Sequence, residues 1–168
     1  MQEPRIVTIS DIKLVGKRIR TSLSQDQTRE LWKSFHPHVH QIENTTGSGL
    51  YSVQVFDDDL SSEGFTPETP FEKWAAVEVN DFGTLNNGME NYTLAGGKYA
   101  VFIHKGLPSD FPKTSQYIHA EWLPGTFYEL DKRPHFEVMK DDLTIPPTPK
   151  QKRKFGIPIR ESEVGYDL

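Results

Sequence analysis

Two segments of this chain alternate apolar and polar side chains with a period of two, at residues 51–56 and 74–79. Such alternation is typical of half-buried antiparallel strands, because successive side chains of a strand point to opposite faces of a sheet. The chain also contains 12 glycines and 12 prolines, which form turns, and 10 Phe, 6 Tyr and 3 Trp among its 168 residues. The sequence therefore predicts many short strands and turns around an aromatic interior.

The other apolar segments predict further strands and two helices. A long or bent strand is expected at residues 6–19, and residues 92–94 and then 97–104 give a second long strand. Shorter strands are expected at residues 135–139 and 155–159, and Pro158 marks the latter as an edge or irregular strand because proline has no N–H for the ladder. Helical spacing of apolar residues predicts helices at residues 25–36 and 115–123.

The two halves of the chain carry similar patterns. Each has a Gly-Lys pair, then a helix with one tryptophan, then a strand that begins with an aromatic residue: Gly16, Trp32 and Tyr51 in the first half, Gly97, Trp122 and Phe136 in the second. This predicts an α+β fold of duplicated β-α-β-β units related by a pseudo-two-fold axis, with an antiparallel sheet, two main helices and a cleft between the halves. We expect half-repeats at about residues 5–80 and 92–160 of a single domain, residues 1–168, with residues 161–168 as a tail.

Composition excludes several classes of protein. The formal net charge is −5, so the chain lacks the basic surface that direct nucleic-acid binding needs. Without cysteine it can form no disulfide framework, thiolate zinc site or iron–sulfur cluster. It has no apolar run of about 18 residues, so no membrane partner is expected. Because the first residues lack the pattern of a secretory signal, we expect a cytoplasmic location.

Six short strings of the sequence together resemble one protein family. They are Leu14-Val15-Gly16-Lys17-Arg18, Trp74-Ala75-Ala76-Val77-Glu78-Val79, Gly96-Gly97-Lys98-Tyr99-Ala100-Val101-Phe102, Glu121-Trp122-Leu123-Pro124, Tyr128-Glu129-Leu130 and Pro134-His135-Phe136-Glu137-Val138. In this order, from about residue 5 to 159, the chain resembles the GyrI-like superfamily: the effector-binding domains of AraC-type and MerR-type transcription regulators and their free-standing relatives. The resemblance implies the duplicated fold and a cleft that binds small, often cationic aromatic compounds.

The resemblance also implies where a ligand binds. It places Glu137 in the cleft and maps the family's Trp-Leu-Pro onto Trp122 and the two residues after it. Relatives often carry a tyrosine two positions after the glutamate, where this chain has Met139, which puts a role in chemistry or ligand contact at that position in doubt. The matching region starts within a few residues of Met1, so the resemblance implies a stand-alone domain without a helix-turn-helix.

Two glutamates are candidates for charge recognition. Glu137 lies between Phe136 and Val138 and faces the other side of its strand. In an apolar cleft desolvation raises the pKa of a carboxyl group unless a cation enters, so Glu137 is expected to select cationic ligands. The alternative is a solvent-facing or salt-bridged residue. Glu78 is a second cleft carboxylate or a partner in an ion pair at the rim.

Aromatic residues are candidates for the walls of the cleft. They are Trp32, Tyr51, Phe71, Trp74, Trp122 and Tyr128. Ring faces hold flat or cationic ligands, with about 0.5–2 kcal/mol for each cation–π contact. The alternative for each ring is packing in the core.

Three histidines, His36, His38 and His40, alternate after the first expected helix. In an extended segment their rings would project to one side, as a metal site requires. No carboxylate nearby completes such a site, so a loop is favoured, with no metal and no cofactor.

These observations predict a protein that binds hydrophobic, including cationic aromatic, small molecules and resembles the effector-binding domains of multidrug-responsive regulators, without its own DNA-binding domain. Two alternatives stay open. One is a hydrolase of reactive xenobiotic-like compounds with Glu137 as general base. The other is a module that binds a protein partner, as gyrase inhibitors do. An enzyme is the less favoured reading.

Overall fold

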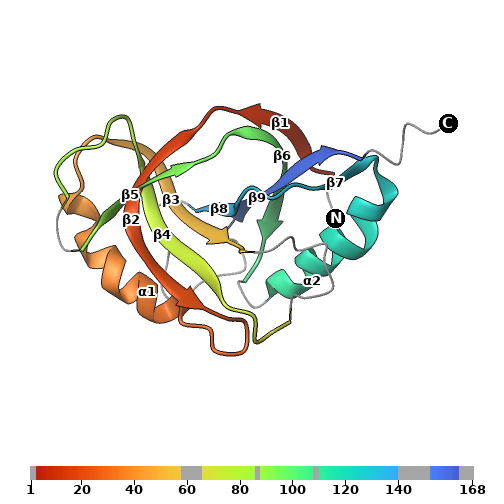
Figure 1. Cartoon of the computed structure of the whole chain (residues 1–168), viewed down its shortest axis with the longest axis horizontal. Coiled ribbons are helices and arrows are strands. Elements are labelled where there is room, and N and C mark those ends of the chain that lie inside the picture. Colours follow the sequence, from red (N-terminus) through yellow and green to blue (C-terminus); the bar gives the residue numbers. More distant parts are fainter. Residues whose placement is uncertain (1–2, 58–65, 86–87, 108–109, 140–151, 163–168) are drawn as a thin grey trace.

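The computed structural model of the chain describes residues 3–57, 66–85, 88–107, 110–139 and 152–162. Its centre is a curved antiparallel sheet with the strand order β1-β6-β9-β8-β3-β4-β2-β5, and β7 pairs with β9 (Figure 1). The strands are β1 (Arg5–Ile9), β2 (Ile12–Thr21), β3 (Thr45–Val55), β4 (Phe71–Val79), β5 (Glu90–Leu94), β6 (Gly97–Lys105), β7 (Tyr128–Leu130), β8 (His135–Met139) and β9 (Lys152–Glu161). The helices are α1 (Thr28–Phe35), the 3₁₀ helix η1 (His36–Gln41), α2 (Phe111–Gln116), the π-helix η3 (Tyr117–Trp122) and the 3₁₀ helix η4 (Leu123–Gly125).

Each half of the chain forms a β-α-β-β unit. The first is β2-α1-β3-β4 and the second is β6-α2-β8-β9, with the short β7 inserted before β8. Along the sheet, β2, β4 and β3 of the first unit mirror β6, β9 and β8 of the second, and the units meet where β3 pairs with β8. This confirms the predicted α+β fold, with duplicated units about a pseudo-two-fold axis between β3 and β8.

Each unit also receives a strand from the other half. β1 leads into β2 but pairs with β6, whereas β5 leads into β6 but pairs with β2. The two connections touch where they cross: the Gly96 N–H donates to Oδ1 of Asp11 at 2.7 Å. A Cβ at Gly96 would lie 2.4 Å from the Ile9 carbonyl oxygen, so only glycine allows this approach.

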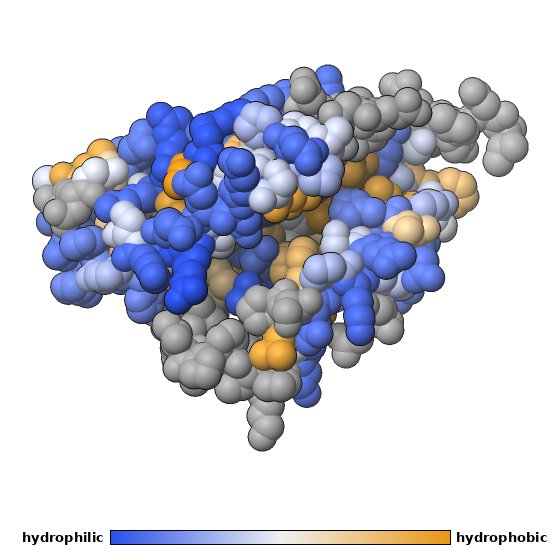
Figure 2. All heavy atoms as spheres, turned by 90° about the horizontal axis from the view of Figure 1, so that it is seen from below, coloured by the Kyte–Doolittle hydropathy of each residue, from blue (hydrophilic) through white to orange (hydrophobic). Residues whose placement is uncertain are grey.

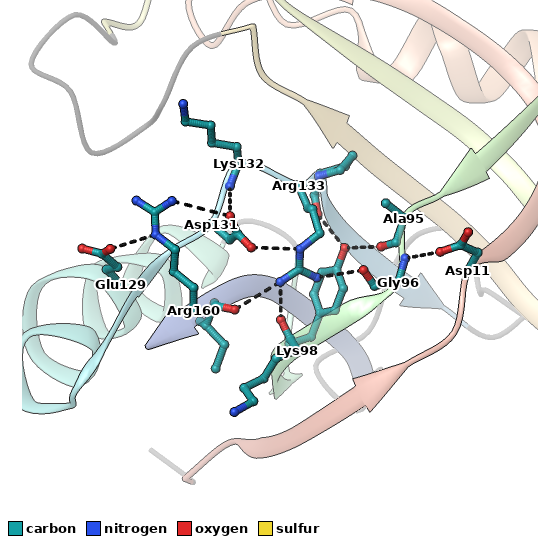
Figure 3. A network of polar contacts seen from close by, with 12 residues as sticks. Asp11, Ala95, Gly96, Lys98, Glu129, Asp131, Lys132, Arg133 and Arg160 are labelled. Carbon is teal, nitrogen blue, oxygen red and sulfur yellow. Dashed lines mark hydrogen bonds and ion pairs between the residues drawn. The ribbon is translucent and has the colours of Figure 1, made fainter. Parts of the chain in front are cut away.

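The side chain of Arg133 links the crossing of the β1–β2 and β5–β6 connections to the second unit (Figure 3). The Arg133 guanidinium donates to the carbonyl oxygens of Gly96, Lys98 and Ile159, at 3.4, 2.8 and 3.1 Å. It also donates to Asp131 at 3.1 Å and lies 4.6 Å from the centre of the Tyr99 ring. The planar fork of arginine suits this role because it presents several donors in fixed directions.

The two main helical segments, α1 and the continuous α2–η3, lie on one face of the sheet, and Figure 1 shows α1 and α2 at the two ends of the molecule. Leu31 and Phe35 of α1 pack on the first unit, and Ile118 and Trp122 of η3 pack on the second. The opposite face carries its own core, with Tyr51, Trp74, Tyr99 and Phe136 among its buried residues. The alternation within each strand thus supplies two cores, one on each side of the sheet.

The structure corrects two expectations for the helical segments. The histidines His36, His38 and His40 lie in η1, not in an extended segment or loop. Three residues per turn direct side chains two apart away from each other, so the expected one-sided row does not form. α2 and η3 together begin at Phe111, before the expected start at residue 115, because a proline fits the first turn of a helix.

Pro158 lies in an irregular part of β9 rather than at an edge: of the two expectations, an edge or an irregular strand, the first is wrong. β9 lies between β6 and β8. The Pro158 carbonyl oxygen accepts a hydrogen bond from the Asp131 N–H at 3.0 Å. The nitrogen and the carbonyl of a strand residue point to the same side, so the Pro158 nitrogen faces the gap between the part of β9 that pairs with β8 and the part that pairs with β7. A missing N–H there breaks no ladder bond. β7 was not expected from the sequence, and residues 163–168 of the expected tail lie outside the described residues.

Candidate functional site

A cavity of about 510 Å³ opens on the helix-bearing face, where the two units meet. Figure 2, which views the molecule from below, shows a hollow with apolar side chains inside and hydrophilic side chains around it. Leu23, with 59 % of its surface exposed, is the apolar residue at its mouth. The other lining residues come from both units: Gln54, Phe56, Phe71, Lys73, Phe111, Ser115, Ile118, His119, Leu130, His135, Phe136, Glu137, Phe155, Gly156 and Ile157.

Strand register brings the polar residues of the cavity floor together. Gln54 of β3 pairs with Lys73 of β4 on one side and with His135 of β8 on the other. Glu137 lies two residues beyond His135 and pairs with Ser52. Residues opposite one another or two apart share a face, so these side chains all point toward the helices.

Glu137 is the carboxylate of the cavity, and its side chain is only 15 % exposed. Among the described residues one group donates a hydrogen bond to it: Nη1 of Arg153, at 3.4 Å from Oε2. Burial raises the pKa of Glu137, and the positive charges of Lys73 and Arg153 oppose that rise. The long contact with Arg153 leaves the charge incompletely compensated, so a positive group entering the cavity would stabilise the ionised form.

Two other titratable groups lie on the floor. Nζ of Lys73 donates to Oγ1 of Thr28 at 2.9 Å. Burial, assisted by the nearby His119, lowers the pKa of His135 to about 3. The His135 imidazole is therefore neutral at neutral pH and offers a ligand one donor and one acceptor.

The walls are aromatic. Phe111 of α2 stacks on Phe155 of β9 with ring centres 4.0 Å apart and 15° between the ring planes. On the other side Phe56 lies against Phe71, at 5.1 Å, and meets His135 edge to face at 5.2 Å. The cavity therefore offers ring surfaces on two sides of a polar floor, which suits a flat ligand.

Two of the residues expected from the sequence, Glu137 and Phe71, line the cavity. Tyr51 and Trp74 lie on the opposite face of the sheet, where Tyr51 packs on Phe136 and Trp74 on Tyr92. Glu78 is also on that face and accepts a hydrogen bond from Ser48 at 2.8 Å. Desolvation, with the charge of Glu78, raises the pKa of Tyr51 to about 12.

The remaining candidates lie on the helix face but outside the cavity lining. Trp122 meets Phe102 edge to face at 5.1 Å, and Trp32 meets Phe35 in the same way at 5.7 Å. Met139 is buried in the core beneath α1. The ring of Tyr128 in β7 lies beneath Lys98, whose Nζ is 5.6 Å from the ring centre.

Most of the lining residues were not predicted from the sequence. His135 had a signal, because it lies two residues before Glu137 and must share its face. Lys73 had none, because the expected strand began at residue 74 and only the register with Gln54 places its side chain on the floor. Phe111 was missed because the second helix begins earlier than its apolar spacing indicates.

In the described ranges of the chain, no three His, Asp or Glu side chains gather closely enough to hold a metal ion. None of the helices within these ranges is long and apolar enough to span a membrane.

Comparison with known proteins places the fold in a wider group. Residues 2–160 match the family model of the GyrI-like small molecule binding domain. The transcriptional regulator BrlR of Pseudomonas aeruginosa is 27 % identical over 155 residues, a match that covers 92 % of this chain and 54 % of BrlR. The chain thus spans about half the length of this curated relative.

Two solved structures share the fold at low sequence identity. SAV2435 bound to tetraphenylphosphonium has a TM-score of 0.70 at 16 % identity, over 95 % of this chain and 94 % of that one. The C-terminal domain of EcmrR has a TM-score of 0.65 at 15 % identity, over 95 % of this chain and 98 % of that one.

Proposed function

Since the chain belongs to the GyrI-like small-molecule binding family, we propose that it binds a hydrophobic aromatic compound with a positive group in the cavity between its two units. The observation that carries this proposal is Glu137, a carboxylate 15 % exposed in an aromatic cavity, with a raised pKa and, within the described part of the chain, one long hydrogen bond, from Arg153. A cationic ligand group favours the ionised carboxylate and adds a second charge-assisted contact beside that of Arg153.

Apolar contact supplies the rest of the affinity. Phe71, Phe111 and Phe155 offer ring surface, and each Å² of apolar surface that leaves water contributes about 25 cal/mol. SAV2435, which shares this fold, has been solved with tetraphenylphosphonium, a hydrophobic aromatic cation, and this supports the proposed class of ligand.

We further propose that ligand binding serves the control of transcription. The support is the similarity to BrlR, a transcriptional regulator of which this chain spans about half. In that role the cavity senses the ligand, and a DNA-binding partner or segment supplies the output.

Calorimetric titration with tetraphenylphosphonium tests the role of Glu137. Glu137→Gln removes the charge but keeps the size, and we expect it to weaken binding about ten- to hundredfold. Glu78→Gln is the matched control, because Glu78 lies on the opposite face of the sheet, and it is expected to leave the affinity within about twofold. Equal binding by wild type and Glu137→Gln would refute the proposal.

A hydrolase is the second candidate, and the raised pKa of Glu137 favours it, since a general base works best when its pKa is near the working pH. Turnover of p-nitrophenyl butyrate by wild type and its loss in Glu137→Gln would support this reading. The alternative of a protein-binding module rests on the family resemblance alone and stays a prediction.

A further inference from the structure

Lys73 brings a second charge into the cavity. Its Nζ contacts the neutral hydroxyl of Thr28, and among the described residues no carboxylate oxygen lies within 4 Å of it. The side chain is partly buried on the cavity floor. A partly desolvated ammonium group with no carboxylate in direct contact favours an anion beside it.

The charges around the cavity do not balance. The described lining contains four titratable residues, Lys73, His119, His135 and Glu137, and Arg153 touches Glu137 from β9. Desolvation lowers the pKa of both histidines, which are therefore neutral near pH 7. Two positive groups thus face one carboxylate. A ligand with only a positive charge adds to this excess, whereas a ligand that also carries a negative group reduces it.

The two charges line the same cavity but come from different strands. Lys73 lies on β4 and Glu137 on β8, with β3 between them and an offset of two residues along the strands, so their backbones are roughly 12 Å apart. Gln54, His135 and the phenylalanine rings occupy the space around this interval. The cavity of about 510 Å³ therefore gives one ligand access to both charged groups.

We propose that the ligand is a zwitterionic aromatic compound whose positive group meets Glu137 and whose carboxylate or equivalent anionic group meets Lys73. This rests on the proposed function, because it places the ligand in the same cavity. It adds the prediction that the protein prefers a zwitterion to a cation with the same aromatic core.

Rhodamine B and its ethyl ester form a matched pair for the test. Both carry the cationic ring system, but only rhodamine B has a free carboxylate. Fluorescence anisotropy titrations of the wild type are expected to give an affinity about tenfold higher for rhodamine B. Lys73→Met is expected to abolish this preference by weakening rhodamine B alone, and Lys73→Arg, which keeps the charge, to retain it.

Two controls separate charge recognition from folding. Lys13→Met removes an exposed lysine whose partner is Asp81, outside the lining, and should leave the preference unchanged. Thermal unfolding shows that Lys73→Met is folded, and retained binding of the ethyl ester shows that its cavity is intact.

The outcomes distinguish the two proposals. If both dyes bind and Glu137→Gln weakens both, but the ester binds as tightly as rhodamine B or Lys73→Met leaves the ratio unchanged, the zwitterion proposal is wrong and the proposed function stands. If Lys73→Met weakens both dyes equally, Lys73 supports the site only through Thr28, and the zwitterion proposal is again overturned. If the wild type binds neither dye, both proposals fail for this class of compound.

Discussion

His135 lies on the cavity floor two residues from Glu137, and its imidazole is held neutral by burial, with a pKa of about 3. In the unfolded chain a histidine has a pKa of about 6.5. The folded protein therefore binds fewer protons between these values, so the contribution of His135 to stability is complete above about pH 6.5 and is lost as the pH falls toward 3. Glu137 affects stability in the opposite direction. Folding raises its pKa, so the destabilisation that it causes grows as the pH rises from the unfolded pKa of a glutamate toward the higher folded one.

We accordingly predict that His135→Gln makes the protein less sensitive to acid. Between pH 7.5 and pH 5 the wild type should lose on the order of 1–2 kcal/mol of stability that the variant keeps, because Gln takes up no proton. Urea unfolding at both pH values measures the difference, with His36→Gln on the exposed part of η1 as control. Equal losses in wild type and His135→Gln would contradict the assignment.

The residues that the sequence could identify are those whose faces follow from a single strand. Phe136 and Val138 placed Glu137 on the other face of β8, and the structure agrees. Tyr51 required more information, because its face relative to Glu137 depends on the pairing of β3 with β8. Tyr51 pairs with Val138, so it points away from the helices. Register between strands distant in sequence is not visible in a periodicity, and this is why the expected walls of the cavity differ from the observed ones.

At the scale of elements, the close approach of β2 to β4 depends on one glycine. A Cβ at Gly16 would lie 2.0 Å from the Ala75 carbonyl oxygen and 2.6 Å from the Ala76 Cα, which are backbone atoms that cannot rotate aside. We expect Gly16→Ala to destabilise the protein by about 2–3 kcal/mol or more, because the strands must separate. Gly125→Ala, where no atom lies within 4 Å of the added Cβ, should change stability by less than about 0.5 kcal/mol.

Chemical unfolding of the two glycine variants measures this contrast. Both substitutions add one methyl group and reduce the freedom of the unfolded chain equally, so the difference between them reports the contact with β4. A difference near zero would show that the sheet can relax around residue 16 and that its curvature does not require glycine there.

The second helix shows why element boundaries were harder to predict than element types. Apolar spacing indicated a helix ending before Pro124. η3 does end before it, at Trp122, but the 3₁₀ helix η4 continues through Pro124 to Gly125. The spacing could not reveal that the helix starts at Phe111. The Phe111 side chain lines the cavity, and Pro112 follows it in the first turn of the helix. It also could not reveal the π-helical turn η3, in which Ile118 and His119 line the cavity and Trp122 packs on Phe102.

At the scale of the whole molecule, the cavity exists because two similar units are joined edge to edge. The pairing of β3 with β8 forms the seam, and Lys73 and Glu137 come from different units. A repeat in the sequence could predict such a seam, but not the exchange of β1 and β5 between the units. The sequence of a strand does not indicate which other strand it pairs with. This exchange makes the two units depend on each other for their edges, so we expect them to unfold together.

The test of this coupling is Arg133, which joins the crossing of the two connections to β9 (Figure 3). Arg133→Met keeps the apolar stem but removes every donor, leaving partly buried carbonyl oxygens without a charged partner. We expect a loss of about 2–4 kcal/mol in the free energy of unfolding, measured with urea. Arg133→Lys should recover less than half of it, because one ammonium group cannot replace a planar fork with donors to three carbonyls.

The exposed ion pair of Arg20 with Asp57 provides the control for this substitution, since both side chains are more than half exposed. Arg20→Met should leave the urea midpoint nearly unchanged. If the units unfold as one, Arg133→Met shifts a single transition without splitting it, as seen by both tryptophan fluorescence and circular dichroism. Two separate transitions would mean that each unit holds its fold alone and that the exchanged strands do not couple them.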